Sequence, residues 1–352
     1  MGVIESFRGV MWARRNQPDE VAYVLGASHE RFGPDDLLRQ AVLAEQAGFD
    51  GIAASDHITP WWEPGEPAPA HCGNAWVWLG AAGQATSHIS IGTGVTGLVH
   101  RYNPVVVAQQ LATLEVMFPG RAYLGAGSSE AMNETPAGMD WPSTGEQLKR
   151  TEESLEIITR LLDGETVTYR GEFFRTDRAR LYLRPARRPP VYLSAFHEQA
   201  AELAGRLTDG VWTLADPTSA PGILAAYRRG CDDAGREPGE VILQSLASVA
   251  ATDEEALEGS REWKASLADE LYTDDIHIPS EIQAKGDDVS DRTFTTGNLV
   301  SADPDVHVTK LKLMRQLGAT AIVLVNASGA DPARMIEMYG ASVLPRLRGE
   351  AD

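Results

Sequence analysis

The sequence offers little to a negatively charged partner, an oxidising compartment or a membrane. Its 352 residues hold 31 Lys and Arg against 50 Asp and Glu, a net charge of −19, so nucleic acid and anionic membrane surfaces would repel it. Only two cysteines are present, Cys72 and Cys231, without metal-binding spacing, which indicates a reducing compartment. No run approaches the ~18 apolar residues of a membrane span, and the N-terminus has no continuous apolar stretch typical of a signal peptide. We therefore expect a cytoplasmic protein whose partner is a small molecule.

Several motifs with a known chemistry are also missing. No G-x-G-x-x-G opens the first crossover, which argues against a doubly wound dinucleotide-binding sheet. There is no phosphate-binding P-loop, no H-E-x-x-H and no close group of histidines or cysteines, so we predict no metal site. These absences leave an organic cofactor as the main alternative for a site with redox or acid–base chemistry.

What the sequence does contain is a regular alternation of strands and helices. Eight short, apolar, β-branched segments alternate with helical patterns, as strands buried on both faces should. The first helix, 33–49, has Asp35 and Asp36 in its first turn and Gly48 at its end, and Pro104 opens the third helix. We predict a (β/α)₈ TIM barrel, with strands at 21–28, 50–55, 89–96, 121–128, 190–195, 209–214, 241–250 and 321–328.

Two segments interrupt this alternation. Residues 164–190 contain "TVTYRGEFFRT", a predicted hairpin with Gly171 in its turn. Residues 271–300 have no sustained periodicity, and long irregular insertions in compact domains are often lids or substrate loops, so we expect a lid there. Neither insertion suggests a separate domain, and we predict one barrel domain over 1–352.

The predicted carboxyl ends of the strands carry polar residues. In TIM barrels the active site lies at that end. The ends read His29-Glu30, Ser55-Asp56-His57, Gly94-Val95, Ser128-Ser129-Glu130 and Phe196-His197, with Trp61 and Trp62 close to His57. Taken singly, each ionisable group has a plain alternative as a helix cap or a solvated side chain. Two glutamates and two histidines converging on one rim favour an active site.

These residues resemble a known family. The stretches "ASHERF", "SDHITPW", "GTGV", "HRYNPVVVAQQLATLEVMFPGRAYLGAGSSEAMNE" and "GRLTDGVWT" look like the luciferase-like barrel superfamily. Within it, "SDH…PW" together with "EAMNE" is most similar to the deazaflavin (coenzyme F420)-dependent glucose-6-phosphate dehydrogenase group. The resemblance covers roughly residues 20–215 and weakens after that. It implies an oxidoreductase that transfers a hydride between an alcohol or carbonyl substrate and F420, and a homodimer, since family members are commonly dimeric.

The resemblance also implies roles for individual residues. His57 would be the general base on the substrate hydroxyl, supported by Glu30, and Glu130 would protonate or neutralise the reduced ring. Trp61 would stack close to the ring, and Gly94-Val95 would form the family's non-proline cis peptide bond. The expected cofactor-binding residues are Asp56, Gly94, Val95, Gly97, Ser128, Ser129, Asn133, Phe196, His197 and Ala200, and the expected substrate-binding residues are Trp61, Leu214 and Lys285.

The substrate is where the sequence departs from the sugar-phosphate members. Where those carry a lysine for the phosphate, this chain has "WTLADPTSAPG", with Asp216 and Pro217. A carboxylate there would repel a phosphate, so we expect a non-phosphorylated alcohol, sugar or ketone. Lys285 is either a second phosphate-binding lysine or a solvated loop residue. Two other functions stay open: an FMN-dependent luciferase-like monooxygenase, and a non-catalytic member that only binds the cofactor.

Overall fold

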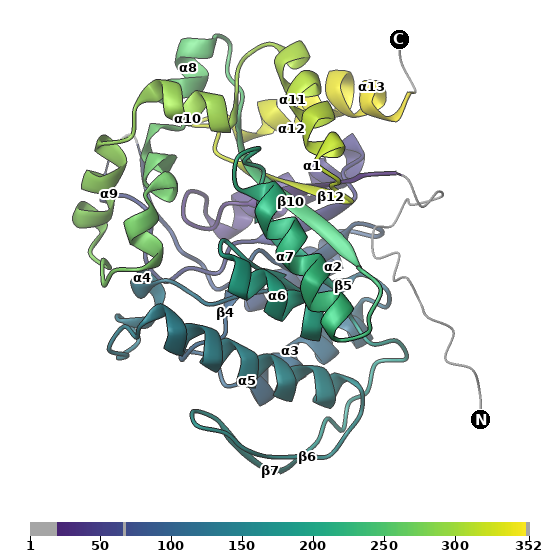
Figure 1. Ribbon diagram of the computed structural model, residues 1–352. Coiled ribbons are helices and arrows are strands. Elements are labelled where there is room, and N and C mark those ends of the chain that lie inside the picture. The colour runs from purple at the N-terminus through teal and green to yellow at the C-terminus, as the bar shows by residue number, and fades with distance from the viewer. Residues whose placement is uncertain (1–19, 66–67, 350–352) are drawn as a thin grey trace.

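A closed barrel of eight parallel strands forms the centre of the molecule (Figure 1). The computed structural model describes residues 20–65 and 68–349. Within them each barrel strand pairs with the next along the chain, β9 pairs with β10, and β12 returns to pair with β1. The circuit confirms the predicted (β/α)₈ barrel. Its strands are β1 Ala22–Ala27, β2 Gly51–Ala54, β3 Ser90–Thr93, β5 Ala122–Gly127, β8 Val191–Ser194, β9 Gly210–Leu214, β10 Glu240–Ser248 and β12 Ala321–Asn326.

Helices surround the barrel and cover the outer faces of its strands (Figure 1). As predicted, Asp35 and Asp36 lie in the first turn of α1, and Gly48 ends it in the left-handed conformation that glycine adopts easily. Asn103 caps α3, with Pro104 in its first turn. The helices between barrel strands are α1 Pro34–Ala47, α2 Ala75–Ala85, α3 Pro104–Met117, α5 Thr144–Leu162, α6 Glu198–Leu207, α7 Ala220–Asp233 and α11 Pro304–Gln316; after β12 come α12 Pro332–Met338, the π-helix η3 Tyr339–Val343 and α13 Leu344–Arg348.

The period-two pattern of the strands separates two layers of core. In β1, Ala22 and Val24 belong to a cluster of residues from alternate strand positions that fills the barrel interior, together with Tyr123 and Trp212. Their neighbour Leu25 packs in the larger cluster between strands and helices. Because both faces are covered, the strands are buried along nearly their whole length. A rigid barrel of this kind fixes the positions of the residues that follow each strand.

The two predicted insertions have different structures. The first is the expected hairpin, β6 Val167–Arg170 and β7 Arg175–Ala179, which lies along α5 at the bottom of Figure 1. The second begins earlier than predicted, at Asp253, and it is largely helical rather than irregular. We call residues 253–298 the cap. It contains α8 Asp253–Glu258, the 3₁₀ helices η1 Arg261–Leu267 and η2 Asp269–Tyr272, α9 Pro279–Asp287 and α10 Asp291–Gly297. Short strands β4 Thr96–Gly97 and β11 Leu299–Val300 add to the sheet beside β5 and β10.

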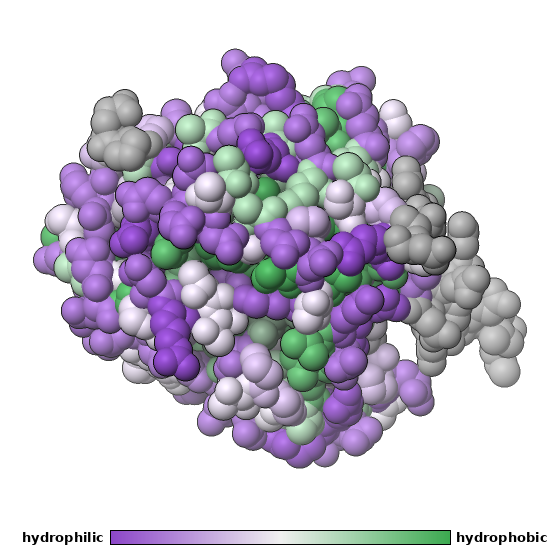
Figure 2. Space-filling view, turned by 90° about the horizontal axis from the view of Figure 1, so that it is seen from above, coloured by the Kyte–Doolittle hydropathy of each residue, from purple (hydrophilic) through white to green (hydrophobic). Residues whose placement is uncertain are grey.

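The surface seen in Figure 2 is mainly hydrophilic, with hydrophobic residues in recesses between polar side chains. This agrees with a chain of net charge −19. Among the described residues, none of the helices combines the length and apolar character needed to cross a bilayer. The N-terminal stretch on which the expected cytoplasmic location partly rests lies outside the described residues.

Candidate active site

A cavity of about 150 Å³ lies between the carboxyl ends of the barrel strands and the cap. The barrel edge, by which we mean the ends of the eight strands and the residues directly after them, contributes most of its lining. The cap contributes the rest. The lining includes Glu30, Ser55, His57, Trp61, Gly94, Val95, Ser128, Ser129, Glu130, Thr144, Gln147, Ser194, Phe196, His197, Ala200, Leu214, Gln244, Trp263, Ser266, Leu267, Tyr272 and Asn298.

His57 and Glu30 form the titratable centre of this cavity. The parallel register pairs Ala27 with Ala54, so the residues that follow β1 and β2 are brought side by side. His57 Nδ1 lies 3.3 Å from Glu30 Oε1, close enough for an ion pair but without the angle of a hydrogen bond. The other oxygen of Glu30 accepts a hydrogen bond of 2.7 Å from the hydroxyl of Ser55.

Burial determines the protonation of both groups. Burial, together with the nearby charges of Arg101 and His29, lowers the pKa of His57 to about 3. Burial also raises the pKa of Glu30 to about 7, against the opposing effect of the Ser55 hydrogen bond. At neutral pH, His57 is therefore an uncharged imidazole able to accept a proton, next to a carboxyl group close to its own midpoint.

Glu130 reaches the same cavity from the end of β5. Burial raises its pKa to about 7, with Arg101 and the hydrogen bond from Asn133 acting in the opposite direction. Asn133 Nδ2 donates to Glu130 Oε2 at 2.8 Å, and Asn133 Oδ1 accepts from the Ile58 N–H at 2.9 Å. Asn133 thus joins the loop that carries His57 to the loop that carries Glu130, and it does not itself line the cavity.

Asp56 is directed away from the cavity. Its carboxylate is buried and accepts hydrogen bonds from Thr96 Oγ1 at 2.7 Å and Tyr102 Oη at 3.2 Å. Arg101 Nη2 lies 3.5 Å from Asp56 Oδ2 and also donates to the Asp56 carbonyl. Arg101, which the sequence reading did not single out, thus contacts the loop between Ser55 and His57 from behind.

The expected backbone features of the barrel edge are present. The Gly94–Val95 peptide bond is cis, as the resemblance implied. Ser129 has φ of +63° in the left-handed region, and its Oγ is buried without a hydrogen-bond partner. Gly97 lies behind Ser129, where an added Cβ would come within 2.5 Å of the Ser129 side chain, so it shapes this turn without lining the cavity.

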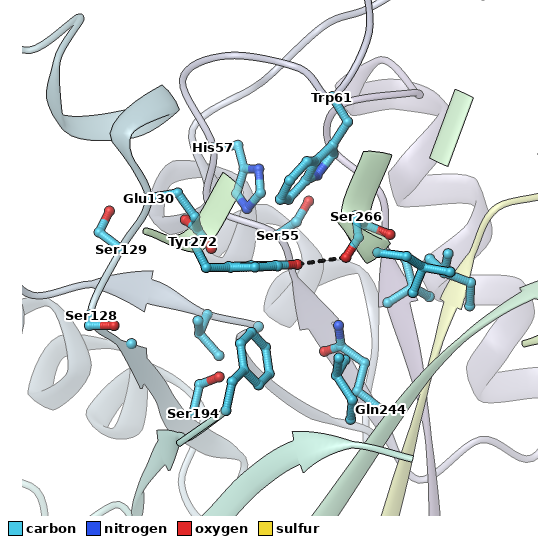
Figure 3. A pocket seen from close by; sticks show the side chains of 18 of the residues that line it. Ser55, His57, Trp61, Ser128, Ser129, Glu130, Ser194, Gln244, Ser266 and Tyr272 are labelled. Atoms are coloured by element: carbon cyan, nitrogen blue, oxygen red, sulfur yellow. Dashed lines mark hydrogen bonds between the residues drawn. The ribbon is translucent and has the colours of Figure 1, made fainter. Parts of the chain in front are cut away.

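Aromatic side chains close the cavity on the cap side. The rings of His57 and Trp61 are 5.3 Å apart, and Trp62 packs edge-to-face against Trp263 of the cap at 5.3 Å. The hydroxyl of Tyr272 donates to the Ser266 carbonyl at 2.8 Å (Figure 3). The sequence reading missed the cap residues that line the cavity, because η1 and η2 lack the periodicity that marks a buried helix.

Two residues used for the substrate prediction lie elsewhere. Lys285, on α9, is outside the cavity lining, and its Nζ is 3.4 Å from Glu270 Oε1. Asp216 also lies outside the lining, where it accepts hydrogen bonds from Ser219 and Thr218 at the start of α7. The case against a phosphorylated substrate therefore does not rest on Asp216. Among the described residues that line the cavity there is no Lys or Arg, and no group of three metal-ligating side chains occurs in 20–65 and 68–349.

Comparisons with known proteins agree on one family. The model of the luciferase-like monooxygenase family matches residues 8–321. The F420-dependent glucose-6-phosphate dehydrogenase of Nakamurella multipartita is 38% identical, over 94% of this chain and 98% of its own. The F420-dependent hydroxymycolic acid dehydrogenase of Mycobacterium tuberculosis is 35% identical, over 91% of this chain and 87% of its own. Among solved structures, an F420-dependent secondary alcohol dehydrogenase in complex with an F420–acetone adduct has a TM-score of 0.89 and 31% identity, covering 94% of this chain and 99% of that one.

Proposed function

This chain belongs to the luciferase-like monooxygenase family and is an F420-dependent oxidoreductase, and we propose that it acts on an uncharged, non-phosphorylated alcohol or ketone. The observation that carries the proposal is the cavity itself. A neutral His57, supported by Glu30, faces a space that also holds Glu130 and has no cationic side chain in its described lining. A hydroxyl group fits such a site better than a phosphate dianion does.

The residues present fit the deazaflavin ring. Ser129 offers a buried hydroxyl with no partner, and Ser128 and Ser194 add two further hydroxyls at the ends of β5 and β8. These uncharged donors suit the carbonyl groups of a flavin-like ring. The first turn of α6 also lines the cavity through His197 and Ala200, where a helix N-terminus favours negative charge on a cofactor tail. Asp56, Gly97 and Asn133, which the sequence reading assigned to the cofactor, support this surface from behind.

Three side chains carry the proposed chemistry. When bound, the deazaflavin accepts or donates a hydride at the ring carbon that replaces N5 of a flavin. His57 takes the proton of the substrate hydroxyl as the alcohol is oxidised, or returns it to the carbonyl oxygen in the reverse direction. Glu130 holds a proton near neutral pH because of its raised pKa. Trp61, which is buried beside His57, excludes water from the reacting groups.

Cofactor binding tests the first part of this proposal. The purified protein is titrated with F420 and, separately, with FMN, following absorbance and fluorescence. We expect low-micromolar or tighter binding of F420 and much weaker binding of FMN. Equal affinity for FMN, together with substrate-dependent peroxide formation, would instead support a luciferase-like monooxygenase.

Substrate turnover tests the second part. Reduction of F420 is followed with a series of secondary alcohols and with glucose 6-phosphate. We expect turnover of uncharged alcohols and little or none of the sugar phosphate. Rapid turnover of glucose 6-phosphate that is lost in Lys285→Ala would contradict the proposal, because it would mean that the cap rearranges to bring Lys285 to the substrate. The homodimer and the cytoplasmic location stay predictions, and the mass of the protein in solution tests the first.

A further inference from the structure

Ser55 lies where β1 and β2 meet at the barrel edge. The register that pairs Ala27 with Ala54 places Ser55 immediately after β2, beside the turn that follows β1. Its backbone N–H donates to the Ala27 carbonyl at 3.2 Å, and its hydroxyl oxygen accepts from the backbone N–H of His29 at 3.0 Å. The position of the Ser55 hydroxyl is therefore set by the backbone of both strands.

The single hydroxyl proton of Ser55 has one good acceptor. Glu30 Oε2 is 2.7 Å from Ser55 Oγ, and the Ala27 carbonyl is farther away at 3.2 Å. The second oxygen of Glu30 is the atom 3.3 Å from His57 Nδ1. The three side chains thus form a continuous series in which Ser55 contacts Glu30 and Glu30 contacts His57 (Figure 3 shows the end residues).

We propose that Ser55 is a positioning residue for proton transfer: its hydroxyl holds the Glu30 carboxylate with one oxygen directed at His57 and favours the ionised form of that carboxylate. A carboxylate in this place stabilises the protonated imidazole that forms when His57 takes the substrate proton. The inference rests on the proposed function, since it assumes that His57 is the base. In this role Ser55 acts on the reaction only through Glu30.

The surroundings of Glu30 determine whether removal of the Ser55 hydroxyl raises or lowers the pKa of Glu30. Burial is the main cause of its raised pKa, Glu130 and Asp56 raise it further, and the Ser55 hydrogen bond lowers it. A hydrogen bond to the charged form is lost when the hydroxyl is removed. The pKa of Glu30 then increases, and Glu30 stays protonated to a higher pH. The titratable or charged groups around the pair are Asp56, Glu130, Cys72, His29 and Arg101.

The test compares Ser55→Ala with Ser55→Thr, which keeps the hydroxyl. A matched control is Ser154→Ala, which removes a buried hydroxyl bonded to the Leu98 carbonyl at 2.9 Å, away from the cavity. We expect the acid limb of kcat/KM in Ser55→Ala to move up by about one pH unit, so that activity falls about tenfold on that limb and recovers on the alkaline plateau. Ser55→Thr and Ser154→Ala should keep the wild-type profile.

A second measurement needs neither cofactor nor substrate. Infrared difference spectra of the ligand-free protein follow the carboxyl band of Glu30, assigned by its loss in Glu30→Gln. In Ser55→Ala this band should persist to a pH about one unit higher than in the wild type. An unchanged Glu30 titration overturns the inference. A shifted titration combined with no turnover by any variant would leave the contact between Ser55 and Glu30 intact and overturn the proposed function instead.

A separate observation concerns Tyr272, which the cap places in the middle of the cavity. On one side of its ring lie His57 and Glu130, and on the other lie Ser194 and Gln244 (Figure 3). The ring is 5.1 Å from that of Phe196 and 6.3 Å from that of Trp61. With Tyr272 in this position the cavity measures about 150 Å³, below the roughly 300–1,000 Å³ of pockets that hold an organic ligand.

We infer that Tyr272 is a displaceable plug: a ligand that reaches both His57 and the strand ends below it must first push the ring of Tyr272 aside. The hydrogen bond from the Tyr272 hydroxyl to the Ser266 carbonyl joins two residues of the cap. It can therefore persist when the cap moves. Besides the ring contacts, two hydrogen bonds join residues directly after Tyr272 to the barrel side: Trp141 Nε1 donates to the Thr273 carbonyl at 3.2 Å, and Thr135 Oγ1 donates to Asp275 at 2.8 Å. Both hydrogen bonds are exposed to solvent, so they add little to the packing that holds the ring in place.

F420 titrations of the wild type, Tyr272→Ala and Tyr182→Ala test this second inference. Tyr182 is a tyrosine that is 91% exposed, and it serves as the matched control. If the open form is about a tenth of the ligand-free protein, removal of the plug should tighten F420 binding about tenfold, while Tyr182→Ala should bind as the wild type does. If Tyr272→Ala is folded, as its melting temperature shows, and binds F420 as weakly as the wild type or more weakly, the inference about Tyr272 is overturned and the proposed function is not. Failure of all three to bind F420 overturns the proposed function on which it rests.

Discussion

The barrel edge and the cap line the same cavity with different chemistry. The barrel edge supplies its titratable side chains, Glu30, His57, Glu130 and His197, whereas the cap residues in the lining are uncharged, among them Trp263, Leu267 and Tyr272. The two regions are also built differently. The barrel-edge groups follow strands whose register is fixed by pairing on both sides, while the cap residues lie on short 3₁₀ helices.

This difference separates two tasks. Proton transfer requires atoms held within a few tenths of an ångström, and a closed sheet gives that precision. Admission of a ligand requires a surface that can move, and short helices outside the barrel sheet can move without breaking strand pairing. Changes at the barrel edge should therefore affect turnover, and changes in the cap should affect binding and local stability.

His57→Ala should have the largest effect on activity. Loss of a general base slows turnover by about 10²–10⁴-fold, and F420 affinity should change much less if, as proposed, hydroxyls at other strand ends bind the ring. Single-turnover reduction of F420 measures this step, with His88→Ala as a control at an exposed histidine. Reduction at the wild-type rate in His57→Ala would place the base elsewhere, and Glu30 and His197 would be the next residues to test.

Glu130→Gln should have a smaller effect. The amide keeps the size of the side chain and an oxygen that can accept from Asn133, but it cannot hold and release a proton. We expect a loss of about 10–10²-fold in the same single-turnover assay, at or below the lower end of the range for a lost proton transfer. Because both groups act on one transition state, the loss in the double variant with His57→Ala should be less than the product of the single losses. A fully multiplicative loss would mean that the two groups serve separate steps.

The contrast between the regions also explains what could be predicted from the sequence. All eight barrel strands could be located because strands buried on both faces are continuous apolar runs. Their ends then indicated Glu30, His57 and Glu130, and all three line the cavity. Residues that act from behind were harder to assign: Asp56 and Asn133 are near the site, but their orientation depends on Arg101 and Ile58, which no local pattern connects to them.

The cap could not be predicted in the same way. Residues 261–272 form 3₁₀ turns, whose hydrophobic side chains follow no period of 3.6 or 2. The sequence therefore places Tyr272 in the irregular segment 271–300, and it does not single out Trp263, which lies before that segment. Lys285 was selected by resemblance alone, and the structure pairs it with Glu270 on the surface. In such a segment, packing against the barrel decides which side chains reach the site.

Arg31→Met tests whether the cap depends on the barrel edge. Arg31 Nη1 lies 2.6 Å from Glu262 Oε1, and both side chains are largely buried, with 7% and 11% exposed. Removal of one partner of a buried ion pair costs about 3–5 kcal/mol of stability. In Arg31→Met we expect this loss to weaken the packing of the cap on the barrel. Hydrogen exchange should increase within 253–298 and not in the barrel, KM should rise, and kcat should fall less than tenfold. The double variant with Glu262→Gln should recover part of the protection from hydrogen exchange. A loss of protection spread over the whole chain would contradict the view that the cap opens independently of the barrel.

Glu153→Ala should have the smallest effect on activity, because it acts on the hairpin and not on the cavity. The Glu153 carboxylate, on α5, accepts hydrogen bonds from the backbone N–H groups of Glu172, Phe173 and Phe174 at 2.7, 3.1 and 2.9 Å. Their loss should lower the free energy of unfolding by about 1–3 kcal/mol, while kcat/KM stays within about twofold of the wild type. Thermal unfolding and steady-state rates are measured beside Glu152→Ala, which removes only an exposed ion pair with Arg206 from the same helix. Neither hairpin strand contributes a residue to the described lining. A large loss of activity in Glu153→Ala, at a temperature where the variant remains folded, would mean that the hairpin influences the site through α5. The first turn of α5 reaches the cavity at Thr144 and Gln147. The hairpin would then count as a third region that affects turnover, besides the barrel edge and the cap.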